Sequence, residues 1–205
     1  MLVAQKLASL RWGWIAQWWL VFLAALLPLL LLIDAVIGNR LGADPAKTIV
    51  DELGTWALIF LWLTLSITPA RRLFNWRKPL LFRRMMGLYA FFYAVLHLAS
   101  VGTFILGWRT DLIVREVTER PYVIAGFVAF VLLLPLAVTS TRGWQARLGR
   151  KWRSLHRLVY PASALVLLHF VWLIRASYAE ALLYGLLLAF LLGIRLYYWR
   201  NGRTR

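Results

Sequence analysis

Long apolar stretches alternate with short charged connections along the whole chain. Six stretches are long enough, or nearly so, to cross about 30 Å of hydrocarbon at roughly 17–25 helical residues each. They lie near Trp14–Ile33, Leu53–Thr68, Met85–Leu106, Tyr122–Val138, Leu158–Ile174 and Ala181–Trp199. The pattern predicts an all-α membrane protein, with one domain over residues 1–205 built as a six-transmembrane-helix bundle. Three prolines inside these spans each remove a backbone hydrogen bond and are expected to kink their helices: Pro28, Pro135 and Pro161.

Composition agrees with a membrane protein and limits its chemistry. Of 205 residues, 62% are hydrophobic and only 16% are charged, which does not describe a soluble globular domain. The chain has no cysteine. It therefore forms no disulfide, thiolate iron ligand, iron–sulfur cluster or covalent c-type haem attachment. Any redox chemistry must come from a cofactor that the chain binds without a thiolate.

The charges separate by connection. The formal charge is +16, and the N-terminus, the second and fourth connections and the C-terminal end carry basic residues without an acid. All eight acids lie in or beside the other three connections: Asp34, Asp44, Asp51, Glu52, Asp111, Glu116, Glu119 and Glu180. The positive-inside rule then predicts that both termini are cytoplasmic. We interpret the charge as a topology signal in a bacterial inner membrane, and we do not expect nucleic acid as a partner.

Two of the three histidines lie at matched depths. His97 follows Arg84 by 13 residues and His169 follows Arg157 by 12. At about 1.5 Å per helical residue, these separations place the two side chains roughly 20 and 18 Å from the basic edge. Because an ionisable residue inside the bilayer is costly, it points to a functional site. We predict that His97 and His169 are the axial ligands of one b-type haem between two helices. With both axial positions filled, electron transfer is the chemistry that remains.

His156, the third histidine, precedes His169 by 13 residues, near the basic edge. A rise of about 20 Å would allow a second haem towards the cytoplasm. The two side chains differ by roughly 140° in phase on an ideal helix, unless Pro161 changes the winding. The positions 13 and 14 residues before His97 are Arg84 and Arg83, so the third span offers no matching histidine. A hydrogen-bonded packing role for His156 is an equal alternative to a ligand role.

The arginines of the second and fourth connections indicate topology, and they could also bind anions. Guanidinium groups bind carboxylates and phosphates in bidentate geometry. Four are candidates for contact with haem propionates or a flavin phosphate: Arg83, Arg84, Arg150 and Arg153.

Two blocks of sequence resemble a known family. The segments TSTRGWQARLGRKWRSLHRLVY and FRRMMGLYAFFYAVLHL are similar to the MsrQ (YedZ) family, the haem-binding membrane subunits of bacterial MsrPQ systems. The resemblance implies a ferric-reductase-like transmembrane domain with b-type haem and FMN, and haem roles for His97, His156 and His169. It implies electrons from quinol or a cytosolic flavin reductase, delivered to MsrP, a periplasmic molybdenum enzyme that reduces methionine sulfoxide in oxidised proteins. The final substrate would then have no catalytic site in this chain.

Two other classes of function stay open at this point. A stand-alone metalloreductase would reduce ferric or cupric ions at the outer face without a partner. A cofactor-free membrane adaptor or transporter would use the histidines for packing alone. Transporters often contain a repeat between their halves, and no repeat is evident to us in the sequence. The mixed charges of residues 109–120 are expected to form a solvated loop rather than a docking surface.

Overall fold

The computed structural model describes residues 2–76, 78–173 and 178–201, with side chains from residue 13 onward. These residues form helices and no strand. The α-helices are α1 (Leu2–Ile37), α2 (Pro45–Phe74), α3 (Arg83–Ser100), α4 (Thr110–Glu119), α5 (Pro121–Val138), α6 (Arg142–Leu148), α7 (Arg150–Leu155), α8 (Val159–Leu173) and α9 (Ala179–Asn201). Short turns of other helix types are η1 (Lys78–Leu81), η2 (Val101–Ile105) and η3 (His156–Leu158).

Six segments are long and apolar enough to cross a membrane. Among the described residues they are Gly13–Ile37, Pro45–Phe74, Arg83–Ile105, Pro121–Val138, Arg150–Leu173 and Ala179–Asn201. The prediction of an all-α, six-span membrane protein is confirmed. The expected end of the fifth span at Ile174 lies outside the described residues, as do the basic residues Arg77, Arg203 and Arg205.

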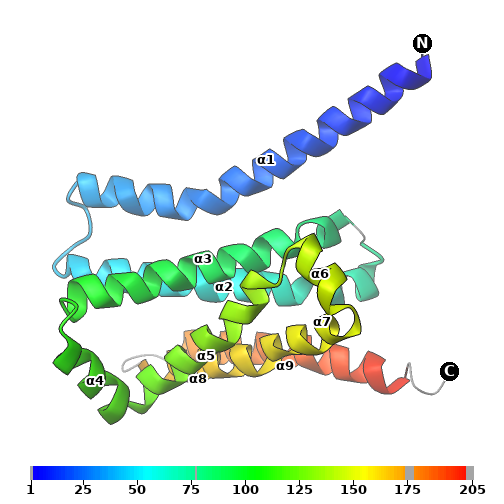
Figure 1. Ribbon diagram of the computed structural model, residues 1–205. Helices are drawn as coiled ribbons and strands as arrows, with labels where there is room; N and C mark the ends of the chain where they lie inside the picture. The colour runs from blue at the N-terminus through cyan, green and yellow to red at the C-terminus, as the bar shows by residue number, and fades with distance from the viewer. Residues whose placement is uncertain (1, 77, 174–177, 202–205) are drawn as a thin grey trace.

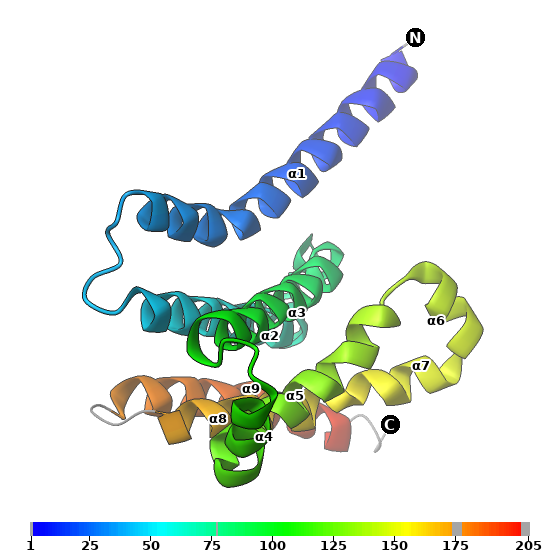
Figure 2. The same ribbon diagram turned by 60° about the vertical axis from the view of Figure 1, so that its left-hand side comes forward.

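The spans run between two ends of opposite charge (Figure 1). At one end lie the α1–α2 turn, α4 and the start of α9, which carry the acids; we call this the acidic end. At the other lie the α2–α3 connection, α6 and α7; we call this the basic end. The first residues of α1 and the last residues of α9 both lie at the basic end. Helix α1 stands apart from the other helices over much of its length (Figure 2).

Helix α1 bends at its proline, and α3 stabilises the bend. Pro28 lies inside α1 and interrupts its hydrogen-bond ladder. Close to this point the hydroxyl of Tyr93, which is fully buried, donates to the carbonyl oxygen of Ala25 at 2.9 Å. The same hydroxyl accepts from the backbone N–H of Leu29 at 3.2 Å. A side chain inserted into a helical ladder is a recognised cause of bending, and here it also anchors α1 to α3.

The buried core is small, and many large apolar side chains lie outside it. The core lies between α2 and α3, where the ring of Phe60 stacks on Tyr93 at 5.3 Å and on Tyr89 at 5.5 Å. Small buried residues, Ala90, Ala129 and Ala162, allow close approach of the helices. Large apolar side chains are exposed along every span. On a membrane protein such surfaces face lipid.

The connections contain more helix than the sequence suggested. Residues 110–119, expected to form a solvated loop, form α4, and the fourth connection contains α6 and α7. Both remain exposed, so the surface position was right and the local structure was not. Helix formation there is explained by local pairs such as Arg115 with Glu119 at 2.9 Å, four residues apart. The winding changes at η3, which begins at His156, before α8 starts at Val159.

Candidate functional site

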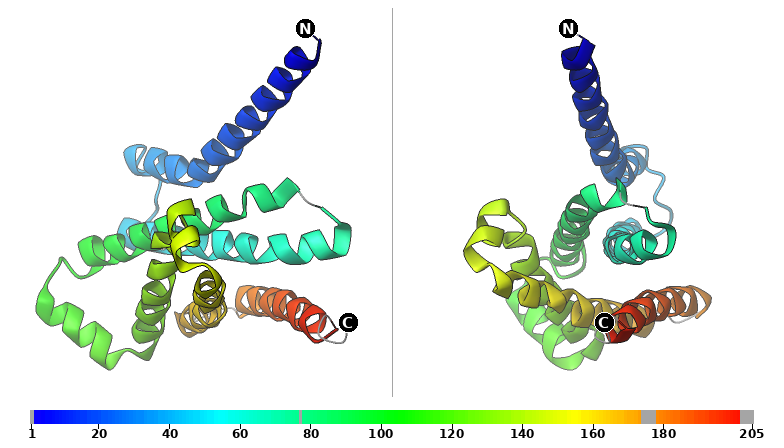
Figure 3. Two further views of the ribbon diagram at one scale, coloured as in Figure 1. Left: turned by 45° about the vertical axis from the view of Figure 1, so that its right-hand side comes forward. Right: turned by 90° about the vertical axis from the view of Figure 1, so that its right-hand side faces the viewer.

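Two imidazoles from different helices meet near the acidic end. The rings of His97 on α3 and His169 on α8 lie 6.3 Å apart between centroids, with an interplanar angle of 77°. Both side chains are largely withdrawn from solvent. The two helices that carry them belong to separate pairs: α3 lies beside α2, α8 lies beside α5, and the α2–α3 pair crosses the α5–α8 pair (Figure 3).

Each imidazole is held by a backbone carbonyl of the partner helix in its own pair. The Nδ1 of His97 lies 2.9 Å from the carbonyl oxygen of Val50 on α2. The Nδ1 of His169 lies 2.7 Å from that of Tyr122 on α5. A carbonyl only accepts, so Nδ1 carries the proton and donates in both residues. The Nε2 lone pairs are then left for a metal, the arrangement that orients most metal-binding histidines.

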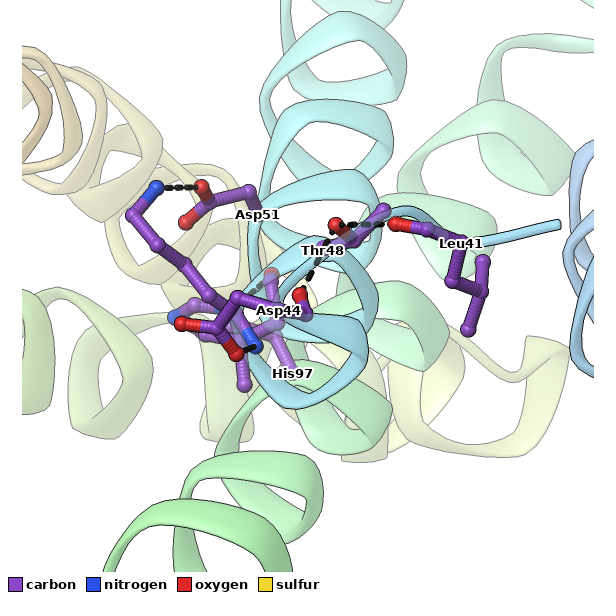
Figure 4. A network of polar contacts seen from close by, with 7 residues as sticks. Leu41, Asp44, Thr48, Asp51 and His97 are labelled. Carbon is purple, nitrogen blue, oxygen red and sulfur yellow. Dashed lines mark hydrogen bonds and ion pairs between the residues drawn. The ribbon is translucent and has the colours of Figure 1, made fainter. Parts of the chain in front are cut away.

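The start of α2 is fixed close to His97. The side chain of Asp44 accepts from the backbone N–H of Lys47 at 3.0 Å and caps the helix. Thr48 donates through its hydroxyl to the carbonyl of Leu41 at 3.0 Å, which ties the preceding turn to the helix. Figure 4 shows His97 beside this network. The capped first turns therefore hold the carbonyl that orients the imidazole.

A glycine lies under each ring. A Cβ built on Gly54 would lie 2.9 Å from the Nδ1 of His97, and one built on Gly126 would lie 2.7 Å from the Nδ1 of His169. Both distances are shorter than real Cβ contacts allow. Each glycine stands four residues after the carbonyl that accepts from the ring. A helix that must receive an imidazole this closely requires glycine at that position.

These matched contacts relate the two helix pairs around the histidines, a relation that inspection of the sequence did not show. In both helix pairs the histidine stands 47 residues after the carbonyl that it contacts. The two sets are related by a shift of 72 residues, and identical residues recur at that shift: Gly54 and Gly126, Ala57 and Ala129, Leu61 and Leu133, Ala90 and Ala162, Leu96 and Leu168, His97 and His169. Few positions keep their identity, since lipid-facing residues need only be apolar, and this hides the relation from inspection.

The geometry fits a metal ion between the two rings. A transition metal lies about 2 Å from an imidazole nitrogen, and the ring centroid lies roughly 1 Å behind that nitrogen. Two imidazoles on opposite sides of one metal would therefore have centroids roughly 6 Å apart, against the 6.3 Å observed. Within residues 13–76, 78–173 and 178–201, no three His, Cys, Asp or Glu side chains gather as a metal site. The pair suits a metal whose remaining ligands come with a cofactor, as in haem.

His156 is engaged differently. Its Nε2 lies 3.1 Å from the hydroxyl of Thr139, and its ring stacks on Trp152 at 4.0 Å. The indole of Trp152 donates to the carbonyl of Thr139 at 2.9 Å, which closes a small network between α5 and α7. This arrangement corresponds to the packing alternative considered for His156. No feature of the sequence predicted Thr139 as its partner, because the contact depends on how α7 folds back on α5.

The four arginines considered for anion binding all lie at the basic end. Arg83 and Arg84 begin α3, and Arg150 and Arg153 belong to α7. All four are exposed, and none forms an ion pair with an acid among the described residues. Arg83 is close enough to interact electrostatically with His156. All four therefore lie at the end of the bundle that also carries His156.

Charged side chains in and beside α4, at the acidic end, pair with one another. Arg109 pairs with Asp111 at 2.6 Å, and Arg120 pairs with Glu116 at 3.0 Å. The hydrogen bond from Arg109 lowers the pKa of the Asp111 carboxyl below its usual value. These pairs leave α4 without a strong field of either sign, although it is exposed.

Comparison with known proteins identifies the family. Residues 53–168 match the model of the ferric reductase like transmembrane component. The protein-methionine-sulfoxide reductase haem-binding subunit MsrQ of Xanthomonas euvesicatoria is 48% identical over 167 residues, which cover 82% of this chain and 76% of that protein. The MsrQ of Rhodospirillum rubrum is 45% identical over 177 residues, 86% of this chain and 85% of that protein. This chain belongs to the MsrQ family.

Membership of the MsrQ family agrees with the resemblance found in the sequence. The ferric-reductase match spans α2 to most of α8, and so includes both helix pairs, both glycines and His97. It ends one residue before His169. The chain is a multi-pass membrane protein of this family. What sequence reasoning missed is the pair of glycines, and their signal was available: each lies 43 residues before its histidine.

Proposed function

We propose that this MsrQ-family protein binds one b-type haem between His97 and His169 and conducts electrons across the membrane. The observation that carries the proposal is the pair of imidazoles, 6.3 Å apart, each with its Nδ1 on a helix carbonyl. The haem would supply one-electron redox chemistry at its iron. Relatives that carry the name haem-binding subunit support the same cofactor.

The chain's own groups would set the properties of that iron. The carbonyls of Val50 and Tyr122 fix the imidazole tautomer and raise the basicity of each ligand. With His97 and His169 both holding the haem, no position would remain at its iron for oxygen or substrate. Partial burial of the pair would limit the access of water to the metal, which affects its reduction potential. A site of this kind suits electron transfer rather than catalysis on a bound substrate.

Electrons would enter at the basic end and leave at the acidic end. The positive-inside rule supports a cytoplasmic basic end in the bacterial inner membrane. We propose quinol or a cytosolic flavin reductase as the donor, and a periplasmic MsrP-like molybdenum reductase that repairs methionine sulfoxide as the acceptor. The relatives' name places them in a methionine sulfoxide reductase, which supports this acceptor. This chain would contain no catalytic site for the sulfoxide.

The basic end would hold a second cofactor, either FMN or a further haem. Arg83, Arg84, Arg150 and Arg153 are exposed cations there without acidic partners among the described residues, and such groups suit a flavin phosphate or haem propionates. His156 would have to leave Thr139 to become an iron ligand. For this reason we favour FMN over a second haem at this end.

Haem quantification in single-histidine variants tests the proposal. Purified His97→Ala and His169→Ala should each lose the same haem, measured as pyridine haemochrome per chain, and His156→Ala serves as the matched control within the same helical region. Reduction by dithionite should shift a Soret band in the wild type. Unchanged haem in both His97→Ala and His169→Ala would contradict the ligand assignment. The absence of any Soret band would favour a cofactor-free adaptor, and reduction of ferric ions without a partner would favour a metalloreductase.

A further inference from the structure

A partly buried arginine near the basic end belongs to none of the sites above. Arg195 lies on α9, six residues before the helix ends at Asn201, within an apolar span. Its Nη2 donates to the carbonyl oxygen of Leu65 on α2 at 2.6 Å. That carbonyl needs an external donor because Pro69, four residues later in α2, has no N–H. The guanidinium also lies 5.2 Å from the ring centroid of Tyr160, so α2, α8 and α9 converge on it.

Two of the three guanidinium nitrogens have no hydrogen-bond partner among the described residues. The Nε and Nη1 atoms of Arg195 are buried and have no hydrogen-bond acceptor among the described residues, and the buried hydroxyl of Thr68 on α2 is in the same state. Satisfying the Leu65 carbonyl requires one N–H, whereas the guanidinium carries five. A buried cation with unmet donors is unfavourable unless an acceptor compensates it. The need of the Leu65 carbonyl for a donor therefore does not by itself account for arginine at this position.

Within the part of the chain that the structure describes, the ionisable neighbours of Arg195 add positive charge and include no acid. Arg72 and Arg83 are close enough to Arg195 to interact with it electrostatically. Arg72 itself lies over the ring of Tyr198, three residues after Arg195 on α9. The five ion pairs formed within the described residues all lie at the acidic end. A side chain that only extended its charge to water would point towards the end of α9, but this one reaches across to α2.

We propose that Arg195 binds an organic oxyanion, a carboxylate or phosphate group of a molecule that enters this end of the bundle, with Thr68 as a second donor. A guanidinium with Nε and Nη1 free can hold such a group by charge-assisted hydrogen bonds. The same chemistry is offered by a haem propionate, a flavin phosphate and the phosphate of an anionic lipid. The inference does not depend on the haem between His97 and His169, because Arg195 lies at the opposite end of the spans.

The test compares Arg195→Gln with Arg200→Gln, both purified in nanodiscs that contain phosphatidylglycerol. Arg200 is exposed on the same helix, so its replacement removes the same charge without touching the buried site. Glutamine at 195 keeps an N–H for the Leu65 carbonyl, which preserves the helix contact. Three quantities are measured per chain: haem as pyridine haemochrome, FMN by fluorescence after extraction, and tightly bound phosphatidylglycerol by native mass spectrometry.

Arg195→Gln should reduce one of these three quantities at least fivefold, and Arg200→Gln should leave all three unchanged. Loss of FMN identifies the flavin phosphate, loss of haem the propionate, and loss of phosphatidylglycerol the lipid headgroup. Equal amounts of all three in a folded Arg195→Gln protein would overturn the proposal. If that variant fails to accumulate, Arg195→Lys with Thr68→Val keeps the charge but removes the planar guanidinium fork and the hydroxyl donor, and the same outcomes apply. The haem site is tested by a different variant, His97→Ala. Failure of the proposed function can therefore be distinguished from failure of this anion-site proposal.

Discussion

The glycines under the two imidazoles offer a demanding test of the haem site, since replacing them adds a single methyl group. In Gly126→Ala the new Cβ would lie 2.7 Å from Nδ1 and 2.9 Å from Cε1 of His169. Ordinary contact begins at 3.4 Å, so the ring must retreat by about 0.7 Å. The backbone of α5 is less free to move, because it is helical on both sides of the position. The imidazole therefore moves, and its hydrogen bond to Tyr122 lengthens or breaks.

The expected magnitude follows from the tolerance of metal sites. Metal and binding constellations must be held within about 0.5 Å of their productive geometry, and loss of the partner that orients a histidine typically costs about 10- to 100-fold in metal affinity. We expect a loss of haem affinity in this range for Gly126→Ala, about 1.4–2.7 kcal/mol. Gly54→Ala should lose less, because its Cβ would lie 2.9 Å from the Nδ1 of His97 and needs about 0.5 Å of movement.

The assay is haem titration into haem-depleted protein, followed at the Soret band. Alanine raises helix propensity by up to about 1 kcal/mol relative to glycine, so the variants should fold. Gly193→Ala is the matched control, since its Cβ meets nothing within 4 Å. Wild-type haem affinity in both Gly126→Ala and Gly54→Ala would refute the reasoning that these rings are held at close approach. A greater loss in Gly54→Ala than in Gly126→Ala would contradict the ranking of the two contacts.

Three further outcomes are expected. The ferric haem should give the low-spin electron paramagnetic resonance signal of nearly perpendicular imidazole planes, because the rings of His97 and His169 lie at 77°; a signal typical of parallel planes would contradict this. Tyr93→Phe should lower the free energy of unfolding by about 1 kcal/mol in detergent titrations, because the buried hydroxyl bonds α1; no change would show that α1 does not need it. Arg109→Gln should raise the pKa of Asp111, measured by carbon NMR, since the hydrogen bond that favours the carboxylate is lost. In the wild type the Arg109–Asp111 pair contributes stability while Asp111 is ionised, and this contribution is lost as the pH falls through the lowered pKa of Asp111.

Much of the fold could be predicted because membrane spans follow from local composition. Hydropathy identified all six segments, and the balance of acidic and basic residues divided their connections into two groups that lie at two ends. Counting residues from the basic edge placed His97 and His169 at one level, and the structure places their rings 6.3 Å apart. Depth along a helix can be read from sequence because the rise per residue is constant.

Contacts between helices could not be predicted in the same way, because they depend on rotation and crossing rather than depth. The carbonyl partners of the imidazoles lie 47 residues away, in helices with no polar signature at those positions. Arg195 counted as one basic residue of the C-terminal end, although its side chain turns inward to a carbonyl left free by a proline on another helix. The contact of His156 with Thr139 depends on the turn of η3, which ideal helical phase does not describe.

The two ends of the bundle differ in how far the two helix pairs match. At the shift of 72 residues that relates His169 to His97, the counterpart of His156 is Arg84. A guanidinium is permanently protonated and has no lone pair to give to iron, so the basic end does not reproduce the paired-histidine site. The replacement exchanges a metal ligand for a cation at the end that also holds Arg83 and the unpartnered nitrogens of Arg195. The acidic end of the two helix pairs thus suits a metal ion, whereas the basic end suits an anion.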